Sequence, residues 1–214
     1  MPERIKVQVA EVQALTPLVR RLVLQAADGK PLPGFTAGAH VRVEVALAQG
    51  RTDWRHYSLV RHAGVDAALP PATYELAVRR EEEGRGGSAF MHALQPGDHL
   101  WIEPPKNDFP LSPQARRVLL VAGGIGVTPL LCMAQRLAAT GASFELHASN
   151  RSLARSAFVE EMRAFGERFH LHLDDGDAAQ KLDLPAVLAR APAGSRIYVC
   201  GPTGFIDHVV ATAK

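Results

Sequence analysis

Hydrophobic and polar residues alternate along the first half of the chain, and this period of two predicts short β-strands. Clusters of glycine and proline separate the runs, as in the segment Pro31-Leu32-Pro33-Gly34. Short strands at this spacing are typical of an antiparallel sandwich or a small barrel, and one helix is expected over 88–94. The expected strands cover 5–9, 18–24, 41–45, 57–60, 74–78 and 99–102.

The second half has continuous apolar runs separated by helical patterns. The run at 118–122 is apolar throughout, as expected of a parallel strand that is buried on both faces. Repeated strand–helix units predict a parallel, doubly wound sheet. Pro110 and Pro113 interrupt the chain between the halves, so two domains are expected, over 1–112 and 113–214. Further strands are expected at 144–147, 169–173 and 197–200, and helices at 129–141, 156–165 and 185–190.

Composition narrows the class of protein. The 214 residues are 47% hydrophobic and 21% charged, which is ordinary for a globular protein with a core. A net charge of +2, without a basic stretch that alternates with aromatic residues, gives no reason to expect nucleic acid. No apolar stretch approaches the roughly 20 residues of a membrane span, so we expect a cytoplasmic protein. Cys132 and Cys200, the two cysteines, lie in apolar or glycine-rich surroundings where a disulfide is not expected.

A glycine-rich turn follows the apolar strand at 118–122. In Gly123-Gly124-Ile125-Gly126 the missing side chains let a ligand approach the backbone, and the next helix offers N–H groups to a pyrophosphate. The segment departs from the dinucleotide fingerprint G-x-G-x-x-G because Pro129 occupies the last glycine position. A tight strand–helix turn without a ligand is the competing interpretation.

A second such turn, Cys200-Gly201-Pro202, follows the strand expected at 197–200. It would lie at the same carboxyl edge as Gly123, where open α/β sheets bind ligands. The alternative for Cys200 is a small buried hydrophobic residue.

The first half carries a third candidate, the segment 55–59. Strand alternation places Arg55, Tyr57 and Leu59 on one face, and His56 and Ser58 on the other. An arginine can bind a phosphate with two hydrogen bonds, and a tyrosine ring can pack on a planar ring system. The turn Gly86-Gly87-Ser88 offers a further phosphate cradle. A plain strand and an ordinary capped turn are the competing interpretations.

Taken in order, these segments resemble the ferredoxin–NADP reductase superfamily, and above all its branch of phthalate dioxygenase reductases and vanillate demethylase reductases. The resemblance extends over nearly the whole chain. The segments that carry it are 55–59, 86–88 with Met91-His92, 104–111, 123–130 and 200–202.

The resemblance implies a six-stranded antiparallel flavin-binding β-barrel followed by a parallel doubly wound sheet that binds NAD(P)H. It places Arg55 and the turn 86–88 at the flavin phosphate, Tyr57 on the isoalloxazine and Ser58 near the flavin N5. It implies catalytic positions for Ser58, Thr128 and Cys200, with Thr128 at the junction of flavin and nicotinamide. The other implied flavin contacts are His56, Leu59 and Val78, and the implied nucleotide contacts are Gly123, Gly124, Gly126, Pro129, Asn150, Arg151, Cys200, Gly201, Pro202 and Phe205.

The branch implies FMN rather than FAD, and NADH, with NADPH left open because Arg151 could meet a 2′-phosphate. Its members continue into a further strand and a plant-type ferredoxin domain, and such a cluster needs four cysteines. With two cysteines we expect no iron–sulfur cluster in this chain. The expectation is therefore a truncated chain or a separate iron–sulfur acceptor, as in the reductase component of a Rieske-type aromatic oxygenase or demethylase.

Three other functions stay open: a stand-alone flavin or ferric reductase, a non-catalytic flavin-binding relay subunit, and a nucleotide-binding scaffold without flavin. His170 and His172, which precede Asp174, Asp175 and Asp177, are candidate metal ligands. Because Phe169, Leu171 and Leu173 alternate with the histidines, solvent-facing strand residues are the favoured interpretation and no metal is expected.

Overall fold

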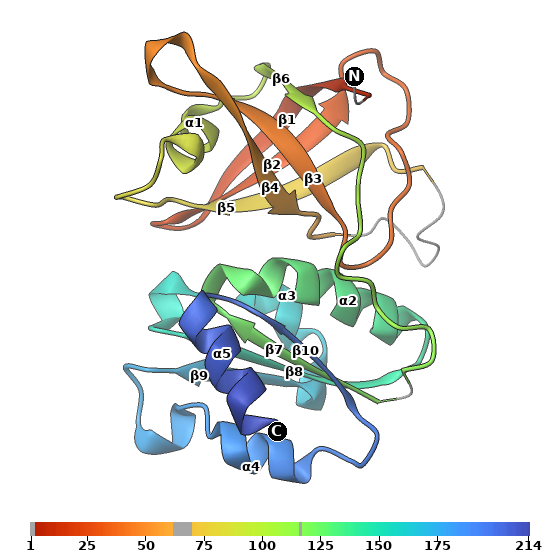
Figure 1. Ribbon diagram of the computed structural model, residues 1–214, viewed down its shortest axis with the longest axis vertical. Helices are drawn as coiled ribbons and strands as arrows, with labels where there is room; N and C mark the ends of the chain where they lie inside the picture. Colours follow the sequence, from red (N-terminus) through yellow and green to blue (C-terminus); the bar gives the residue numbers. More distant parts are fainter. Residues whose placement is uncertain (1–2, 62–69, 116) are drawn as a thin grey trace. The chain divides into compact units, whose positions relative to one another are not determined.

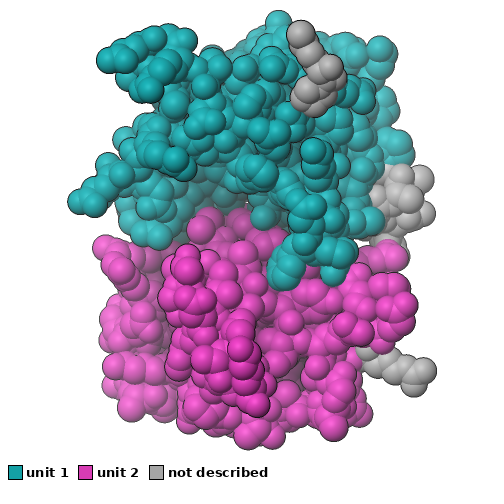
Figure 2. Space-filling view, viewed as in Figure 1, with its two compact units in different colours: residues 1–110 teal, residues 111–214 magenta. Residues whose placement is uncertain are grey.

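The computed structural model describes residues 3–61, 70–115 and 117–214. The chain divides into two compact units, Met1–Pro110 and Leu111–Lys214 (Figure 2). The break lies two residues before the domain boundary expected from the sequence, at the proline-rich segment that suggested it.

The first unit is a six-stranded antiparallel sheet with the strand order β4-β3-β6-β1-β2-β5 (Figure 1). Directly after β4, the Val60 N–H donates to the Glu75 carbonyl of β5 at 3.0 Å, so the two edge strands meet at this point. The antiparallel six-stranded arrangement confirms the predicted fold. Its elements are β1 (Ile5–Thr16), β2 (Val19–Ala26), β3 (His40–Ala46), β4 (Thr52–Ser58), β5 (Thr73–Arg79), α1 (Gly87–Ala93) and β6 (His99–Ile102).

The core of this unit follows the alternation of the strands. Inward-facing positions alternate along each strand with residues that face the other side of the sheet. Four of the inward side chains are completely buried: Val7, Leu22, Val41 and Leu76. Each fully buried aliphatic side chain contributes roughly 1.5–3 kcal/mol relative to an exposed one.

The strand β4 begins five residues earlier than expected, at Thr52 instead of Tyr57. Its first half is polar and gives no hydrophobic alternation. Trp54 explains why it is still a strand: the guanidinium groups of Arg4 and Arg42 lie 5.1 and 5.3 Å from its ring centroid. Arg42 lies on the neighbouring strand β3 and Arg4 directly precedes β1, and such contacts stabilise a strand without an apolar pattern in its own sequence.

The second unit is a four-stranded parallel sheet with the order β10-β7-β8-β9. Leu119 and Val121 of β7 pack against Leu184, Val187 and Val209 of α4 and α5. Figure 1 shows α2 and α3 on the opposite face of the sheet, which confirms the doubly wound prediction. The elements are β7 (Arg117–Gly123), α2 (Val127–Ala139), β8 (Ser143–Asn150), α3 (Val159–Arg163), β9 (Phe169–Leu173), α4 (Leu184–Arg190), β10 (Arg196–Cys200) and α5 (Thr203–Thr212).

The helix α3 is shorter than the expected 156–165. Phe158 has a φ of 63°, in the left-handed region, so the helix begins only at Val159. Within the part of the chain that the structure describes, no helix is both long enough and apolar enough to span a membrane. The two cysteines form no disulfide, as expected.

Candidate functional site

Arg55 lies on β4 beside the beginning of α1. Its cross-strand partner is the fully buried Val43, and directly opposite residues share a face of the sheet. From this face its side chain reaches Gly87, where a Cβ would lie 2.9 Å from the Arg55 Nε and 3.0 Å from its Cγ. Only a residue without a side chain lets the guanidinium lie so close to the backbone there. The arrangement therefore holds a cation against a glycine turn, which suits an anionic group.

The Arg55 guanidinium is also held from its own strand. Its Nη1 donates to the Trp54 carbonyl at 3.0 Å and to the Asp53 carboxylate. The arginine lowers the pKa of Asp53, so this carboxylate stays ionised. A phosphate at this place would therefore share the guanidinium with Asp53 or displace it.

The turn before α1 is closed by a serine. Gly86 has a φ of 87°, which favours glycine, and the Ser88 Oγ accepts a hydrogen bond from the Glu81 N–H at 3.0 Å. Ser88 thus fixes the loop that carries Gly86 and Gly87, but it does not cap α1, whose N-cap is Gly86 without a side-chain hydrogen bond. Its contact with a phosphate stays a prediction.

The remaining residues of the 55–59 segment are divided between the two faces and the core. Tyr57 is half-buried on the Arg55 face, and burial raises its pKa to about 12, so it is a neutral phenol near pH 7. His56, on the other face, stacks on His40 with 4.8 Å between ring centroids. Ser58 is half-buried opposite His40. Leu59 is fully buried.

Val78 is also buried, at 2% exposure, and its carbonyl accepts a hydrogen bond from the His92 Nε2 at 2.7 Å. The side chains of Leu59 and Val78 therefore belong to the core of the first unit. Their expected flavin contacts stay predictions.

In the second unit, the two glycine-rich loops meet at the carboxyl edge of the sheet. Ala122 of β7 lies opposite Cys200 of β10. A Cβ at Gly126 would lie 2.2 Å from the Cys200 carbonyl oxygen, and one at Gly201 would lie 3.1 Å from the Gly123 Cα. These glycines are required because the two loops pack backbone against backbone.

Gly124 differs from its neighbours. Its φ is 54°, and among the described residues nothing lies within 4 Å of the position that a Cβ would take. The backbone is thus accessible here, as the ligand-binding interpretation requires, while the adjacent glycines serve close packing.

Thr128 and Pro129 lie in the first turn of α2 and are buried. The Thr128 Oγ1 donates to the Ile125 carbonyl at 3.0 Å and closes the turn. Cys200 is a half-buried thiol, and burial raises its pKa, so it is neutral near pH 7. Their predicted catalytic positions concern both units together and stay predictions.

Phe205 has a packing role that the sequence did not suggest. A Cβ on Gly123 would lie 2.8 Å from its ring, and one on Gly201 would lie 3.0 Å from it. The ring therefore covers both glycines. Pro202 is the N-cap of α5, and its carbonyl accepts a hydrogen bond from the Phe205 N–H at 2.9 Å. Nucleotide contacts of Pro202 and Phe205 stay predictions.

Asn150 and Arg151 stand at the carboxyl end of β8, the edge that also carries Gly123 and Cys200. Their carbonyls accept from the N–H groups of Asp174 and Asp175 at 3.0 and 3.1 Å. Arg151 itself is exposed. Four candidate residues from three strands thus share one edge of the parallel sheet, where open α/β sheets bind ligands.

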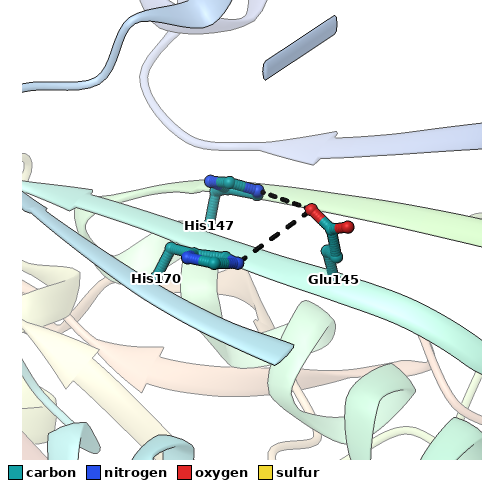
Figure 3. Close-up of side chains that lie close together, drawn as sticks. All are labelled: Glu145, His147 and His170. Atoms are coloured by element: carbon teal, nitrogen blue, oxygen red, sulfur yellow. Dashed lines mark hydrogen bonds and ion pairs between the residues drawn. The ribbon is translucent and has the colours of Figure 1, made fainter. Parts of the chain in front are cut away.

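The sequence analysis missed one cluster, formed by Glu145, His147 and His170 on neighbouring strands (Figure 3). It had linked His170 only with His172 and the following aspartates. Glu145 and His147 share the two-residue spacing of His170 and His172, and this was the available signal. His170 and His172 are half-buried rather than solvent-facing, because the rings of both stack on the ring of His147.

An antiparallel unit with a basic glycine turn, followed by a parallel unit with two glycine loops at one edge, defines a class of two-domain oxidoreductases. Residues 6–110 match the family model of the oxidoreductase FAD-binding domain. Residues 101–214 match that of the dimethylamine monooxygenase subunit DmmA-like N-terminal domain. The chain belongs to the ferredoxin–NADP reductase superfamily, in the branch of phthalate dioxygenase reductases and vanillate demethylase reductases that its sequence resembles.

Known relatives agree with this family. Vanillate O-demethylase oxidoreductase of Pseudomonas sp. (strain HR199 / DSM 7063) is 44% identical over 191 residues, 88% of this chain and 57% of that protein. Carnitine monooxygenase reductase subunit of Escherichia coli (strain K12) is 38% identical over 210 residues, 97% of this chain and 63% of that protein.

Among solved structures, phthalate dioxygenase reductase matches with a TM-score of 0.86 and 32% identity, over 98% of this chain and 64% of that one. The chain thus spans between 57% and 64% of the length of these three proteins.

Proposed function

We propose that the chain is the flavin- and nucleotide-binding part of an NAD(P)H-dependent reductase that passes electrons to an iron–sulfur centre of an oxygenase or demethylase system. The observation that carries the proposal is the fit of Arg55 over Gly87, a preformed cationic cradle in the unit that matches the oxidoreductase FAD-binding domain. The relatives named as reductase subunits of monooxygenases support the assignment to an oxygenase system.

Each residue has a task in this proposal. Arg55 and the backbone at Gly87 hold the flavin phosphate, and the neutral Tyr57 packs on the flavin ring from the same strand face. The accessible backbone at Gly124 binds the nucleotide phosphates, with Arg151 at the same edge. When bound, nicotinamide and flavin supply the redox chemistry, a hydride transfer followed by the release of single electrons. The chain itself binds and orients, and no acid–base pair is required of it.

The flavin in this proposal is FMN, as the branch resemblance implies. The matched domain model is named for FAD, which favours the other cofactor. Denaturing the purified flavoprotein and separating the released flavin by chromatography identifies it directly. NADH is the proposed reductant on the same resemblance, and cytoplasmic location stays a prediction of the sequence.

The proposed acceptor follows from cysteine chemistry. A plant-type cluster needs four cysteine ligands, and these 214 residues contain two cysteines. The iron–sulfur centre of the proposal therefore lies outside this sequence. This assignment is tested by measuring the rate of electron transfer from the NADH-reduced protein to a plant-type ferredoxin, and by comparing it with the rate of transfer to free flavin or ferric chelates. Faster reduction of the free acceptors would favour a stand-alone flavin or ferric reductase.

The flavin assignment is tested by replacing Arg55 with glutamine, which keeps much of the side chain and removes the charge. Hydrogen bonds to charged groups contribute about 1.5–3 kcal/mol, so we expect flavin affinity to fall about 10- to 100-fold. Arg51→Gln is the matched control, because Arg51 is exposed immediately before the same strand. Flavin fluorescence titration of both folded variants measures the difference. Equal affinity in Arg55→Gln and Arg51→Gln would remove Arg55 from the flavin site.

A further inference from the structure

One face of the parallel sheet carries a carboxylate and several imidazoles from adjacent strands (Figure 3). Glu145 and His147 are two residues apart in β8, so their side chains share a face. The parallel register pairs His147 with His170 of β9, and Ser149 with His172. Pairing of the strands thus brings together ligand-type residues that are more than twenty positions apart in the sequence.

The separations of the ligand atoms suit a metal ion. The His147 Nε2 lies 3.3 Å from the Glu145 Oε2, and the His170 Nε2 lies 4.0 Å from the same oxygen. One ligand atom from each residue lies within 4.8 Å of the others. A tetrahedral zinc ion with bonds of about 2.0–2.1 Å places its ligands about 3.4 Å apart. The rings of His147 and His170 are stacked, with 4.5 Å between centroids and 17° between planes, so the more exposed His170 ring must turn before both nitrogens face one ion.

His147 is oriented by a second histidine. Its Nδ1 lies 2.9 Å from the Nε2 of the half-buried His172. With the proton of His147 on Nδ1, the lone pair of Nε2 faces Glu145 and His170. Histidine ligands of metals are commonly fixed in this way by a partner at the other ring nitrogen.

The site is closed on one side and open on the other. His147 is 3% exposed, whereas the side chains of Glu145 and His170 are 57% and 42% exposed. An ion can therefore enter from solvent and be held against a buried imidazole.

We propose that Glu145, His147 and His170 bind a divalent transition-metal ion, with Zn²⁺ as the best fit and water completing its coordination. Two imidazoles and a carboxylate suit Zn²⁺ and its borderline neighbours, whereas Mg²⁺ and Ca²⁺ prefer all-oxygen sites. The ion would join β9, the edge strand of the sheet, to β8. None of its three ligands is among the residues expected at the flavin or at the nucleotide.

The test uses the flavin-loaded protein after treatment with a chelator. Titration with Zn²⁺ against a chromophoric chelator measures affinity and stoichiometry, and Co²⁺ absorbance reports the coordination geometry. We expect one Zn²⁺ per chain. His170→Asn and Glu145→Gln should weaken binding at least tenfold, and both change exposed side chains that the fold tolerates. His172→Asn should weaken it about 10- to 100-fold through the orientation of His147.

His99→Asn is the control, because His99 is exposed in the first unit. It should bind Zn²⁺ like the unchanged protein, and Mg²⁺ should not compete. Zn²⁺ should also raise the melting temperature of the unchanged protein, and the increase should be absent in His170→Asn. Zn²⁺ affinity that is the same in His170→Asn and His99→Asn, or no saturable binding at all, would overturn the proposal.

Discussion

Arg151 is an exposed cation at the carboxyl end of β8, close in sequence to the buried Asn150 that ends the strand. A guanidinium there can meet the 2′-phosphate of NADPH, whereas an acidic side chain favours NADH. We therefore expect Arg151→Glu to lower kcat/KM with NADPH at least tenfold more than with NADH.

Steady-state kinetics with both nucleotides measures this difference. Arg190→Glu serves as the matched control, since Arg190 is an exposed arginine at the end of α4, and it should change neither value. An equal effect of Arg151→Glu on the two nucleotides would exclude Arg151 from cofactor selection.

Tyr57 makes the first unit sensitive to alkaline pH. Burial raises its pKa to about 12, although Arg55 acts in the opposite direction. In the unfolded chain a tyrosine titrates near about 10, so the unfolded state loses its proton first. The stabilisation is complete below about pH 10 and is lost as pH rises towards about 12.

Tyr57→Phe should therefore reduce the loss of stability between pH 9 and pH 11. Tyr74, whose pKa is also raised by burial, accounts for a remaining decline. Both tryptophans of the chain, Trp54 and Trp101, lie in the first unit, so urea unfolding followed by their fluorescence reports on it. Tyr198→Phe, in the second unit, is the control. A Tyr57→Phe profile as steep as that of Tyr198→Phe would contradict the assignment.

Among the elements, the two loops at the carboxyl edge of the parallel sheet contain glycines of two kinds. Gly126 faces the Cys200 carbonyl, where a Cβ would lie only 2.2 Å away, whereas Gly124 has open space but a φ of 54°. Gly126→Ala should lower the free energy of unfolding by about 3 kcal/mol, since backbone must move. Gly124→Ala should lower it by about 1 kcal/mol, the cost of the left-handed conformation.

Hydrogen exchange of peptides from β7 and α2 measures the two effects in the second unit. The two substitutions also separate the roles of these glycines. Gly124→Ala should weaken nucleotide binding in a protein that is still folded, whereas Gly126→Ala should mainly destabilise the fold. Equal destabilisation by the two substitutions would show that close packing of the loops is not what requires Gly126.

The same elements show what the hydrophobic pattern can predict. The apolar run of β7 and the alternation of β3 and β5 identify strands because burial on the sheet requires those residues. The start of β4 escaped prediction because Trp54 is stabilised by Arg4 and Arg42, which lie elsewhere in the sequence. The helix α3 was predicted too long because the left-handed Phe158 leaves no mark in the periodicity.

Some of the candidate-site residues could likewise be predicted from the local sequence, and others could not. The glycine loops could be located from sequence, since a strand followed by glycines and a helix is a local signal. The Glu145, His147 and His170 cluster could be located only in part, because the spacing within each strand is local but the approach of His170 to His147 depends on the register between β8 and β9. The expected ligand contact of Phe205 stays a prediction, and the structure adds a packing role, because its ring lies against Gly123 and Gly201. Contacts between distant segments are the information that the linear pattern lacks.

At the scale of the whole molecule, each unit carries a feature to which the proposed function assigns one cofactor. The first unit holds a cation over a glycine turn, and the second exposes backbone at Gly124 on the ligand-binding edge of its sheet. The proposed function requires both features to act in a single reaction, because reduction of the flavin consumes the nucleotide.

Anaerobic mixing of the flavin-loaded protein with NADH, followed by visible absorbance, tests this requirement most directly. We expect the flavin absorbance to bleach rapidly, and we expect Arg55→Gln, with its weaker flavin binding, to give a smaller signal at the same concentrations. A flavin spectrum that stays unchanged with both NADH and NADPH, in protein that holds its flavin, would contradict the proposed reductase activity.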